Sequence, residues 1–306
     1  MELPPPAPFN ASEGSGLIIV PGPSSTGLGR KIGELLKVRV LSVEFKRFAD
    51  GESYIRFEDE VKNENVVIIQ TTAPPQNENL IQLLLMIDNA RDMGARNITA
   101  VVPYLAYSRQ DSRFRPGEAF SIRTIMTLLK TCGATGVITV NSHNPALLKT
   151  MPVPVTDLSA FGLLAEYFRD NGLEGAFSVS LGKKGEDVAA EAGRILKGGY
   201  DYVSTQRDRV SGEVTIERKK FPVNQKDVVL FDDVMSSGRS MAKAVAWIKE
   251  QGARRVCVAC VHVLLIGDGQ ELVLKSGAEE IVATDTIPTK LSKVTIAPLI
   301  ARQLQM

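Results

Sequence analysis

The sequence predicts an α/β fold of two similar domains, each with a mainly parallel sheet flanked by helices. Short apolar runs typical of buried strands alternate with amphipathic helical runs over almost the whole chain. A proline-rich stretch with Pro145, Pro152 and Pro154 interrupts this alternation near the middle. The chain has 306 residues, enough for two domains of ordinary size. We therefore expect two α/β domains that are separated near these prolines.

The first half of the chain has the pattern of one such domain. Apolar runs predict strands at 17–20, 38–45, 54–57, 66–70, 98–102 and 137–140. Helices are predicted from Gly27, at 77–93 and at 118–130, and the second of these repeats apolar residues three and four positions apart. Residues 1–15 are rich in Pro, Ser and Gly, which predicts a flexible arm.

The second half repeats this order. Strands are predicted at 177–181, 200–203, 228–231, 256–265 and 281–284, and helices at 158–169, 186–196, 241–249 and 293–304. Residues 204–213 are polar and without periodicity, which predicts a mobile loop that can act as a lid. We place the N-terminal domain at 16–155 and the C-terminal domain at 156–290. Whether the helix in 291–306 packs back on the N-terminal domain is left open.

Composition narrows the class of function. Hydrophobic residues make up 44% and charged residues 23% of the chain, as in ordinary globular proteins. The net charge of +1 gives no reason to expect nucleic acid or an acidic membrane as a partner. No apolar run reaches the roughly 20 residues of a membrane span, and the N-terminus lacks the features of a signal peptide. Three cysteines do not suit a disulfide scaffold, so we expect a cytoplasmic protein.

Cys257 and Cys260 have the Cys-x-x-Cys spacing of many redox and metal sites. They lie in an apolar run that predicts a buried strand, and free cysteine is a common core residue. No second pair is present to complete a structural zinc site. We therefore interpret both cysteines as core residues.

The stretch Val228–Met241 carries the clearest functional pattern. A predicted strand ends at Asp232 and Asp233, and a loop of small residues then leads into a helix. Ligands of α/β sheets bind beyond the carboxyl ends of strands, and such a loop offers backbone amides to an anion. Hydroxyl donors are added by Ser236, Ser237 and Ser240. The pattern predicts a bound phosphate, with the carboxylates holding ribose hydroxyls or a divalent cation; on local grounds a plain helix N-cap is the alternative.

Three other loops carry polar residues after predicted strands. The loop 103–116 combines Arg109, Arg113 and Arg115 with two tyrosines, which suits a stacked base and bound phosphates or, equally, a solvated basic loop. His143 follows the strand 137–140 and is either a ligand of metal or phosphate or an ordinary loop histidine. The loop 182–185 has two lysines between glycines and is a second candidate anion site.

Several segments occur in a characteristic order. They are Phe48–Glu52, Asn77–Leu80, Pro103–Asp111, Asp232–Met241, Ala259–Asp268 and Ala283–Thr286. Together these segments resemble ribose-phosphate diphosphokinase, also called phosphoribosyl-diphosphate synthase, and most closely its archaeal forms. The resemblance covers nearly the whole chain after the N-terminal arm, and it implies a duplicated phosphoribosyltransferase-type fold.

The resemblance also implies an activity, a cofactor and a set of site residues. The activity is transfer of the β,γ-diphosphate of ATP to the anomeric hydroxyl of ribose 5-phosphate, with Mg²⁺, giving phosphoribosyl diphosphate and AMP. By resemblance, ATP contacts Arg109, Gln110 and Asp111, and its adenine contacts Phe48, Asp50 and Glu52 across a subunit boundary of a dimer-based homo-oligomer. Ribose 5-phosphate contacts Asp232, Asp233, Ser236, Ser237, Gly238, Arg239 and Ser240. The metal ligands are His143, Asp232 and Asp233, and the catalytic residues are Arg207, Arg209 and His143.

Four positions depart from the family pattern. The lid usually has a lysine followed by an arginine, where this chain has Arg207 and Arg209. Acids usually stand at the position of Asn141 and before the glycines near 182, and both are missing here. Arg239 replaces a small residue and either strengthens anion binding or blocks the pocket. Two alternatives therefore stay open: a non-catalytic nucleotide-binding paralogue that regulates a partner synthase, and a diphosphokinase with another sugar-phosphate acceptor. The sequence does not fix acceptor specificity, nucleotide preference, oligomer size or allosteric regulation.

Overall fold

The chain forms two compact units. The structure is a computed structural model that describes residues 16–113, 115–181, 185–203, 205–207, 214–216 and 219–306, with only the backbone at 205–207 and 214–216. Unit 1 contains Met1–Leu158 and Thr295–Met306, and unit 2 contains Ser159–Val294. The predicted arm at 1–15 lies outside the described residues.

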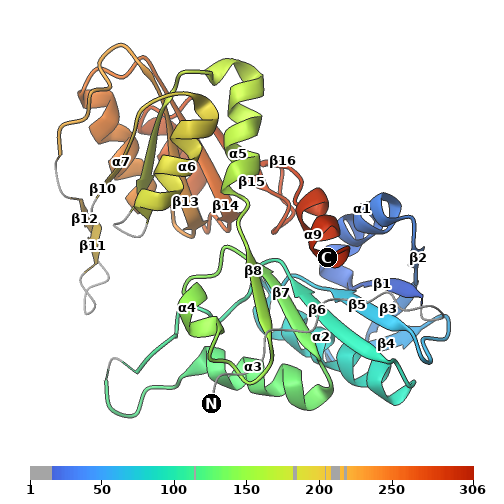
Figure 1. Cartoon of the computed structure of the whole chain (residues 1–306). Coiled ribbons are helices and arrows are strands. Elements are labelled where there is room, and N and C mark those ends of the chain that lie inside the picture. Colours follow the sequence, from blue (N-terminus) through green and yellow to red (C-terminus); the bar gives the residue numbers. More distant parts are fainter. Residues whose placement is uncertain (1–15, 114, 182–184, 204, 208–213, 217–218) are drawn as a thin grey trace. The chain divides into compact units, whose positions relative to one another are not determined.

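Unit 1 is built on a six-stranded sheet in the order β2-β1-β5-β6-β7-β8, in which every neighbouring pair is parallel (Figure 1). Its strands are β1 (Leu17–Pro21), β2 (Arg39–Val40), β5 (Asn65–Ile69), β6 (Asn97–Val102), β7 (Gly136–Val140) and β8 (Val155–Leu158). The central strand β5 is buried at every position. Its continuous run of Val and Ile suits this position, because helices cover both faces of a parallel sheet and leave no side of the strand exposed to water.

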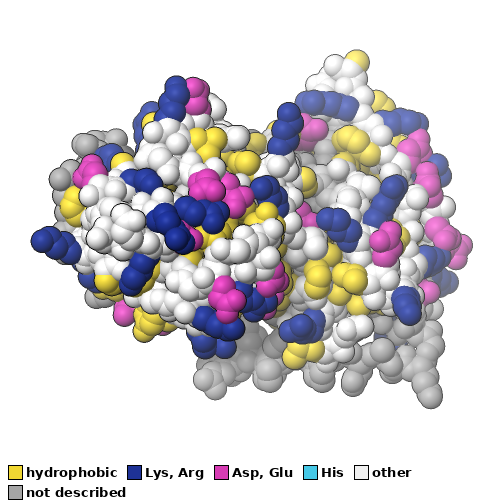
Figure 2. All heavy atoms as spheres, turned by 90° about the horizontal axis from the view of Figure 1, so that it is seen from above, with side chains coloured by type: hydrophobic (Ala, Val, Ile, Leu, Met, Phe, Trp, Pro, Cys, Tyr) yellow, Lys and Arg dark blue, Asp and Glu magenta, His cyan; other side chains and the backbone are white. Residues whose placement is uncertain are grey.

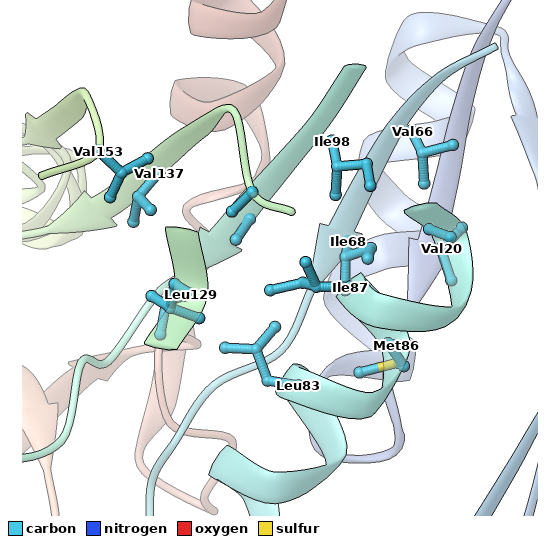
Figure 3. Close-up of a cluster of buried hydrophobic side chains, with 14 of the residues drawn as sticks. Val20, Val66, Ile68, Leu83, Met86, Ile87, Ile98, Leu129, Val137 and Val153 are labelled. Atoms are coloured by element: carbon cyan, nitrogen blue, oxygen red, sulfur yellow. The ribbon is translucent and has the colours of Figure 1, made fainter. Parts of the chain in front are cut away.

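The core of unit 1 forms where helices pack on this sheet. One face is covered by α2 (Gln76–Asp92) and α3 (Ser121–Cys132), whose apolar residues share a buried cluster with the strands. Figure 3 shows Leu83, Met86 and Ile87 of α2 directed toward Ile68 and Ile98 of the sheet. On the opposite face α1 (Thr26–Leu36), preceded by η1 (Pro23–Ser25), packs against β1 and against α9 (Ala297–Leu304). A short helix, α4 (Pro145–Leu148), follows β7.

A separate antiparallel hairpin, β3 (Val43–Arg47) and β4 (Ser53–Phe57), leaves the sheet of unit 1 after β2. Its turn contains Phe48, Asp50 and Glu52 of the predicted ATP site. Gly51 takes φ +99° there, a conformation that residues with a Cβ rarely adopt. The hairpin is fixed to α2, because Arg47 lies 3.5 Å from a carboxylate oxygen of Glu78.

Unit 2 has a second parallel sheet, in the order β10-β9-β13-β14-β15-β16. Its strands are β9 (Phe177–Leu181), β10 (Tyr200–Val203), β13 (Asp227–Met235), β14 (Arg255–Val263), β15 (Glu280–Thr284) and β16 (Ser292–Val294). The helices are α5 (Phe161–Phe168), which continues into η2 (Arg169–Leu173), α6 (Glu186–Leu196), α7 (Arg239–Glu250) and α8 (Gly269–Lys275). Helices α5 and α6 pack together and contact the sheet. Helices α7 and α8 also pack together, and α7 contacts β13 and β14. In addition, β11 (Thr205–Arg207) pairs with β12 (Val214–Ile216).

The predicted fold class is confirmed, and the errors in the predicted elements have local causes. The predicted strand 38–45 is interrupted after Val40, so that it contributes to both the sheet and the hairpin. The helix predicted at 158–169 begins at Phe161, because β8 comes first. We missed β8 because prolines precede it, although proline is tolerated at the start of an edge strand. The elements β16 and α8 are too short to show a period.

Both signs of charge occur on the face of the molecule drawn in Figure 2. Lys and Arg side chains are interspersed with Asp and Glu over the face in Figure 2, as a net charge of +1 leads one to expect. Among the described helices, none is both long enough and apolar enough to cross a bilayer.

Cys257 and Cys260 lie in β14, have free thiols and are fully buried. Residues three apart on a strand point to opposite faces, so the two thiols do not form a joint site. Burial raises the pKa of Cys257 to about 12 and that of Cys260 well above its ordinary value. These observations match the interpretation of both as core residues.

Candidate active site

The sheet of unit 2 has a point where the strand order reverses. The chain runs outward from β9 to β10 and then returns to β13 on the other side of β9. Connections that leave neighbouring strands in opposite directions create a crevice at the carboxyl edge, where α/β proteins bind ligands. The strand β13 includes Asp232 and Asp233 near its end, and Ser236–Gly238 then leads into α7. The sequence-predicted phosphate loop, Ser236–Gly238, therefore lies at this crevice.

The phosphate loop presents unmatched donors to the crevice. Gly238 is the N-cap of α7 at φ 73° and ψ −9°, and its carbonyl accepts the amide of Ala242 at 2.8 Å. The first turn of α7 contains no acid that would offset the positive end of the helix dipole. The hydroxyls of Ser236, Ser237 and Ser240 have no hydrogen-bond partner in the described part of the chain. Such a loop can hold a dianionic phosphate.

The two aspartates are half-buried and are oriented by the backbone. Oδ1 of Asp232 accepts the amide of Asp233 at 3.0 Å, and Oδ1 of Asp233 accepts the amide of Val234 at 2.8 Å. Burial and these carboxylates together raise the pKa of the neighbouring Cys260 thiol. The pair therefore supplies concentrated, fixed negative charge beside a loop built for an anion.

Arg239 is the first residue of α7, and its side chain is exposed. It makes no hydrogen bond or ion pair with the described residues. Its guanidinium is therefore available to an anion that is bound by the loop.

In unit 1 the predicted ATP-binding loop follows β6. Arg109 is exposed and has no ion-pair partner in the described part of the chain. Gln110 accepts the hydroxyl of Ser121 at the start of α3 through Oε1. Asp111 accepts the side-chain amide of Asn144 at 2.8 Å. This last bond ties the loop to the segment after β7.

That segment, Asn141–Asn144, carries the exposed His143. Ser142 donates its backbone amide to Asp157 at 3.0 Å and its hydroxyl at 2.9 Å. Burial raises the pKa of Asp157, although these hydrogen bonds oppose the change. With Asn144 bonded to the preceding loop, the residues on both sides of His143 are fixed. Sequence reasoning does not single out Asp157, because it lies in β8, a strand that the prolines before it obscure.

The backbone conformation at position 141 suits asparagine, which stands where the family usually has an acid. Its φ is 42°, in the left-handed region, and its amide donates to the carbonyl of Leu158 at 2.8 Å. Asn and Asp both tolerate this region better than most residues, so the local conformation is compatible with either type.

The hairpin turn of unit 1 places an exposed aromatic ring beside two acids. The side chain of Phe48 is 52% exposed, and its ring packs edge-on to Tyr54 at 6.0 Å between centroids. Asp50 accepts the amide of Glu52 at 3.2 Å, which shapes the turn. The ring is thus supported on one side and open on the other.

Some predicted residues lie outside this description. Arg209 and residues 182–184 are not described, and for Arg207 only the backbone in β11 is described. Gly185 is the N-cap of α6.

The described residues contain no group of three or more His, Cys, Asp and Glu side chains arranged to hold a metal ion. Asp232 and Asp233 nevertheless fit Mg²⁺, which binds through one or two carboxylates together with waters and substrate phosphates. The chemistry of this donor set therefore suits a metal that arrives with a phosphorylated substrate.

The fold and the loop of unit 2 define a phosphoribosyltransferase-type protein, and comparisons with known proteins narrow the class. The model of the N-terminal domain of ribose phosphate pyrophosphokinase matches residues 17–133, and that of the phosphoribosyl transferase domain matches residues 162–288. The chain belongs to the ribose-phosphate pyrophosphokinase family, as its sequence segments predicted.

Individual relatives agree over nearly full length. Ribose-phosphate pyrophosphokinase of Sulfurisphaera tokodaii is 36% identical over 94% of this chain and 100% of its own length. That of Methanopyrus kandleri is 37% identical over 94% and 99%, respectively. The crystal structure of phosphoribosylpyrophosphate synthetase from Mycobacterium smegmatis is similar with a TM-score of 0.83 at 28% identity, covering 95% of this chain and 98% of that chain.

Proposed function

We propose that this protein transfers the diphosphate of ATP to ribose 5-phosphate, giving phosphoribosyl diphosphate and AMP. The anomeric oxygen of the sugar forms a bond to the β-phosphorus of ATP and loses its proton. The bond between the β-phosphorus and the oxygen bridging to the α-phosphorus breaks, and that oxygen leaves with AMP. The observation that carries the proposal is the phosphate loop beside Asp232 and Asp233, in a chain that matches the family over nearly its whole length.

The sugar phosphate is assigned to unit 2. The amides and hydroxyls of Ser236–Ser240 bind the 5-phosphate, and Arg239 adds a cation to the same anion. Asp232 and Asp233 accept the ribose hydroxyls, which orients the anomeric carbon. Such positioning is a large part of catalysis in phosphoryl-type transfers.

ATP is assigned to the loops of unit 1. Phe48 stacks on adenine, and Asp50 and Glu52 accept hydrogen bonds from the amino group of adenine. The remainder of the nucleotide is held by Arg109, Gln110 and Asp111. His143 binds the metal-bound triphosphate from a loop held by Asp157 and Asp111. Arg207 and Arg209 neutralise charge that develops on the transferring diphosphate.

Mg²⁺ is the proposed cofactor, and Asp232, Asp233 and His143 are its proposed protein contacts. When bound, it neutralises phosphate charge and draws electron density from the β-phosphorus. Dependence on the metal is tested by titrating EDTA against fixed ATP and then restoring Mg²⁺.

The direct test uses purified protein with ATP, ribose 5-phosphate and Mg²⁺, and measures AMP and phosphoribosyl diphosphate. We expect both products in equal amounts, formed only when both substrates are present. Absence of AMP above a blank without enzyme would end the proposal and favour the non-catalytic alternative. AMP release with another pentose phosphate, and little with ribose 5-phosphate, would favour the third hypothesis. No observation on the structure favours either alternative.

We also infer a homo-oligomer built from dimers in which Phe48 of one chain serves the nucleotide of another. The half-exposed ring at the tip of a hairpin supports this inference. Light scattering at assay concentrations tests it, and a monomer that retains full activity would overturn it.

A further inference from the structure

Within unit 2 a second loop lies against the phosphate loop. This supporting loop, 264–268, connects β14 to α8. The amides of Leu264 and Leu265 donate to the carbonyl of Met235 at 3.0 and 3.2 Å, and the amide of Ile266 donates to the carbonyl of Ser236 at 2.9 Å. Three donors of the supporting loop are thus satisfied by two consecutive carbonyls, those of the last residue of β13 and of the first residue of the phosphate loop.

The next carbonyl along the phosphate loop meets the start of α8. A Cβ added at Gly269 would lie 2.8 Å from the carbonyl oxygen of Ser237, and a Cβ added at Gly238 would lie 2.8 Å from the carbonyl oxygen of Gly269. Distances this short mean that the two backbones are in direct contact and leave no space for a side chain at either glycine. The carbonyls of Met235, Ser236 and Ser237 therefore all face the supporting loop and α8.

This arrangement fixes where the amides of the phosphate loop point. In a trans peptide the C=O and the following N–H point in opposite directions. Because the carbonyls of Met235, Ser236 and Ser237 face the supporting loop, the next three amides point away from it. Those amides belong to Ser236, Ser237 and Gly238, and the side of the loop to which they point is the side where we place the phosphate.

The supporting loop has its own restricted backbone. Leu265 takes φ +40° without being glycine, a conformation seen in few such residues. Its side chain is half-buried against the core of unit 2, which holds the backbone in this conformation. Val273 of α8 is fully buried and packs beneath Gly238, since its Cγ2 lies 3.0 Å from a Cβ added there. The support is therefore anchored in the core.

We propose that the supporting loop and Gly269 are positioning elements that aim the three amides of the phosphate loop at the 5-phosphate of the sugar substrate. The proposal rests on the proposed function and assigns a role to residues that touch no substrate. Moving the carbonyl of Ser237 turns the peptide that carries the amide of Gly238, so the anion loses aligned donors although the hydroxyls and aspartates remain. A substitution remote from the reacting atoms that displaces a substrate-positioning group by about 1 Å is enough to lower the reaction rate by up to about a hundredfold.

The test is Gly269→Ala, which places a methyl group against the carbonyl of Ser237. We expect the KM for ribose 5-phosphate to rise about tenfold or more, with the KM for ATP changed by less than about twofold and cooperative thermal unfolding retained. The matched control is Gly172→Ala in η2, outside both loops, which introduces backbone strain at φ +85° but has no atom within 4 Å of the new methyl. A KM for ribose 5-phosphate in Gly269→Ala no higher than in this control, or an equal rise for both substrates, would overturn the proposal.

A double variant shows which of two contacts of the new methyl raises the KM in Gly269→Ala, the one with the Ser237 carbonyl or the one with the Leu265 side chain. The added methyl also lies 3.1 Å from Cδ2 of Leu265, so Leu265→Ala removes that contact but leaves the backbone contact. We expect Gly269→Ala with Leu265→Ala to keep the raised KM, and recovery to the value of the Leu265→Ala single variant would refute a role for the backbone. If Gly269→Ala does not fold, Val273→Ala replaces it, because it loosens the packing beneath Gly238 without adding a clash. Val273→Ala with both KM values unchanged would also refute the proposal. Wild-type protein is assayed first, so failure of the proposed function shows as absence of AMP in the wild type itself.

Discussion

Asp233→Asn tests the proposed contact between unit 2 and the ribose hydroxyls. Asparagine keeps the shape of the side chain and an oxygen that can accept the Val234 amide, which Asp233 Oδ1 accepts at 2.8 Å in the structure. It removes the charge and one acceptor oxygen. A hydrogen bond from a neutral hydroxyl to a carboxylate contributes about 1.5–3 kcal/mol. At about 1.4 kcal/mol per factor of ten, kcat/KM for ribose 5-phosphate should fall by about 10- to 150-fold.

The assay is steady-state AMP formation with ribose 5-phosphate varied at saturating ATP and Mg²⁺, together with urea unfolding. We expect Asp233→Asn to unfold within about 1 kcal/mol of wild type, because its backbone hydrogen bond is retained. Asp233→Ala should lose turnover and about 1 kcal/mol more stability, because the Val234 amide loses its acceptor. Asp170→Asn is the control: it is exposed and pairs with its neighbour Arg169. Wild-type kcat/KM in Asp233→Asn would refute the assignment of this carboxylate to the sugar.

Four further predictions concern other parts of the chain. Arg207→Ala should lower kcat far more than it raises either KM, because a lid cation acts mainly in the transition state; equal changes in both would indicate a binding role. Phe48→Ala should raise the KM for ATP by about tenfold and leave that for ribose 5-phosphate unchanged, because a stacked base is worth about 1–3 kcal/mol; fluorescence titration with an ATP analogue checks this. The Arg254 guanidinium donates to both carboxylate oxygens of Asp227 and lowers the pKa of that carboxyl below its usual 3.8. The contribution of this ion pair to folding stability is therefore complete above pH 3.8 and is lost as the pH falls toward the lower pKa that Asp227 has in the folded state. The free energy of unfolding of wild type should therefore exceed that of Asp227→Asn at about pH 6, and the difference between them should shrink as the pH falls below 3.8; a difference that does not change with pH would contradict this cause. Finally, the native protein should react with a thiol reagent at Cys132 alone, because Cys132 is half-buried whereas the two cysteines of β14 are fully buried; three fast-reacting thiols would contradict the structure.

Hydrophobic periodicity was enough to predict the fold class, because a long apolar run is compatible with few structures other than a buried strand or the buried face of a helix. β13 and α7 were predicted within a few residues of their ends, since Val228–Leu230 is continuously apolar and α7 repeats its buried residues at helical spacing. Short elements failed for the opposite reason. β16 has three residues and α8 has seven, so neither completes enough periods to stand out from loop sequence.

The candidate site was predictable only where its parts adjoin in sequence. Asp232, Asp233 and the following serines form one stretch, so their joint meaning could be read directly. Asp157 holds Ser142 from another strand, fifteen residues away, and no local pattern connects the two. The supporting loop is a similar case, because its amides bond carbonyl groups, which every residue has. The residue types in the two loops therefore do not predict this contact. The exception is Gly269, where the close approach of two backbones requires glycine.

The two units share a strand order but differ in how their crevices are filled. In unit 1 the order reverses between β1 and β5, and the loops after those strands bond each other. Ser24 donates its hydroxyl to the carbonyl of Thr71 at 2.7 Å and its amide to Gln70 at 3.1 Å, and Ser25 accepts the amide of Thr71 at 2.8 Å. A Cβ added at Gly22 would lie 2.3 Å from Gln70, so that crevice is closed by its own side chains. An anion there would have to break satisfied hydrogen bonds, whereas the hydroxyls of the phosphate loop in unit 2 have no partner in the described part of the chain to give up. We infer that after duplication of one fold the first crevice serves to hold the unit together, and that the sugar phosphate is recognised in unit 2.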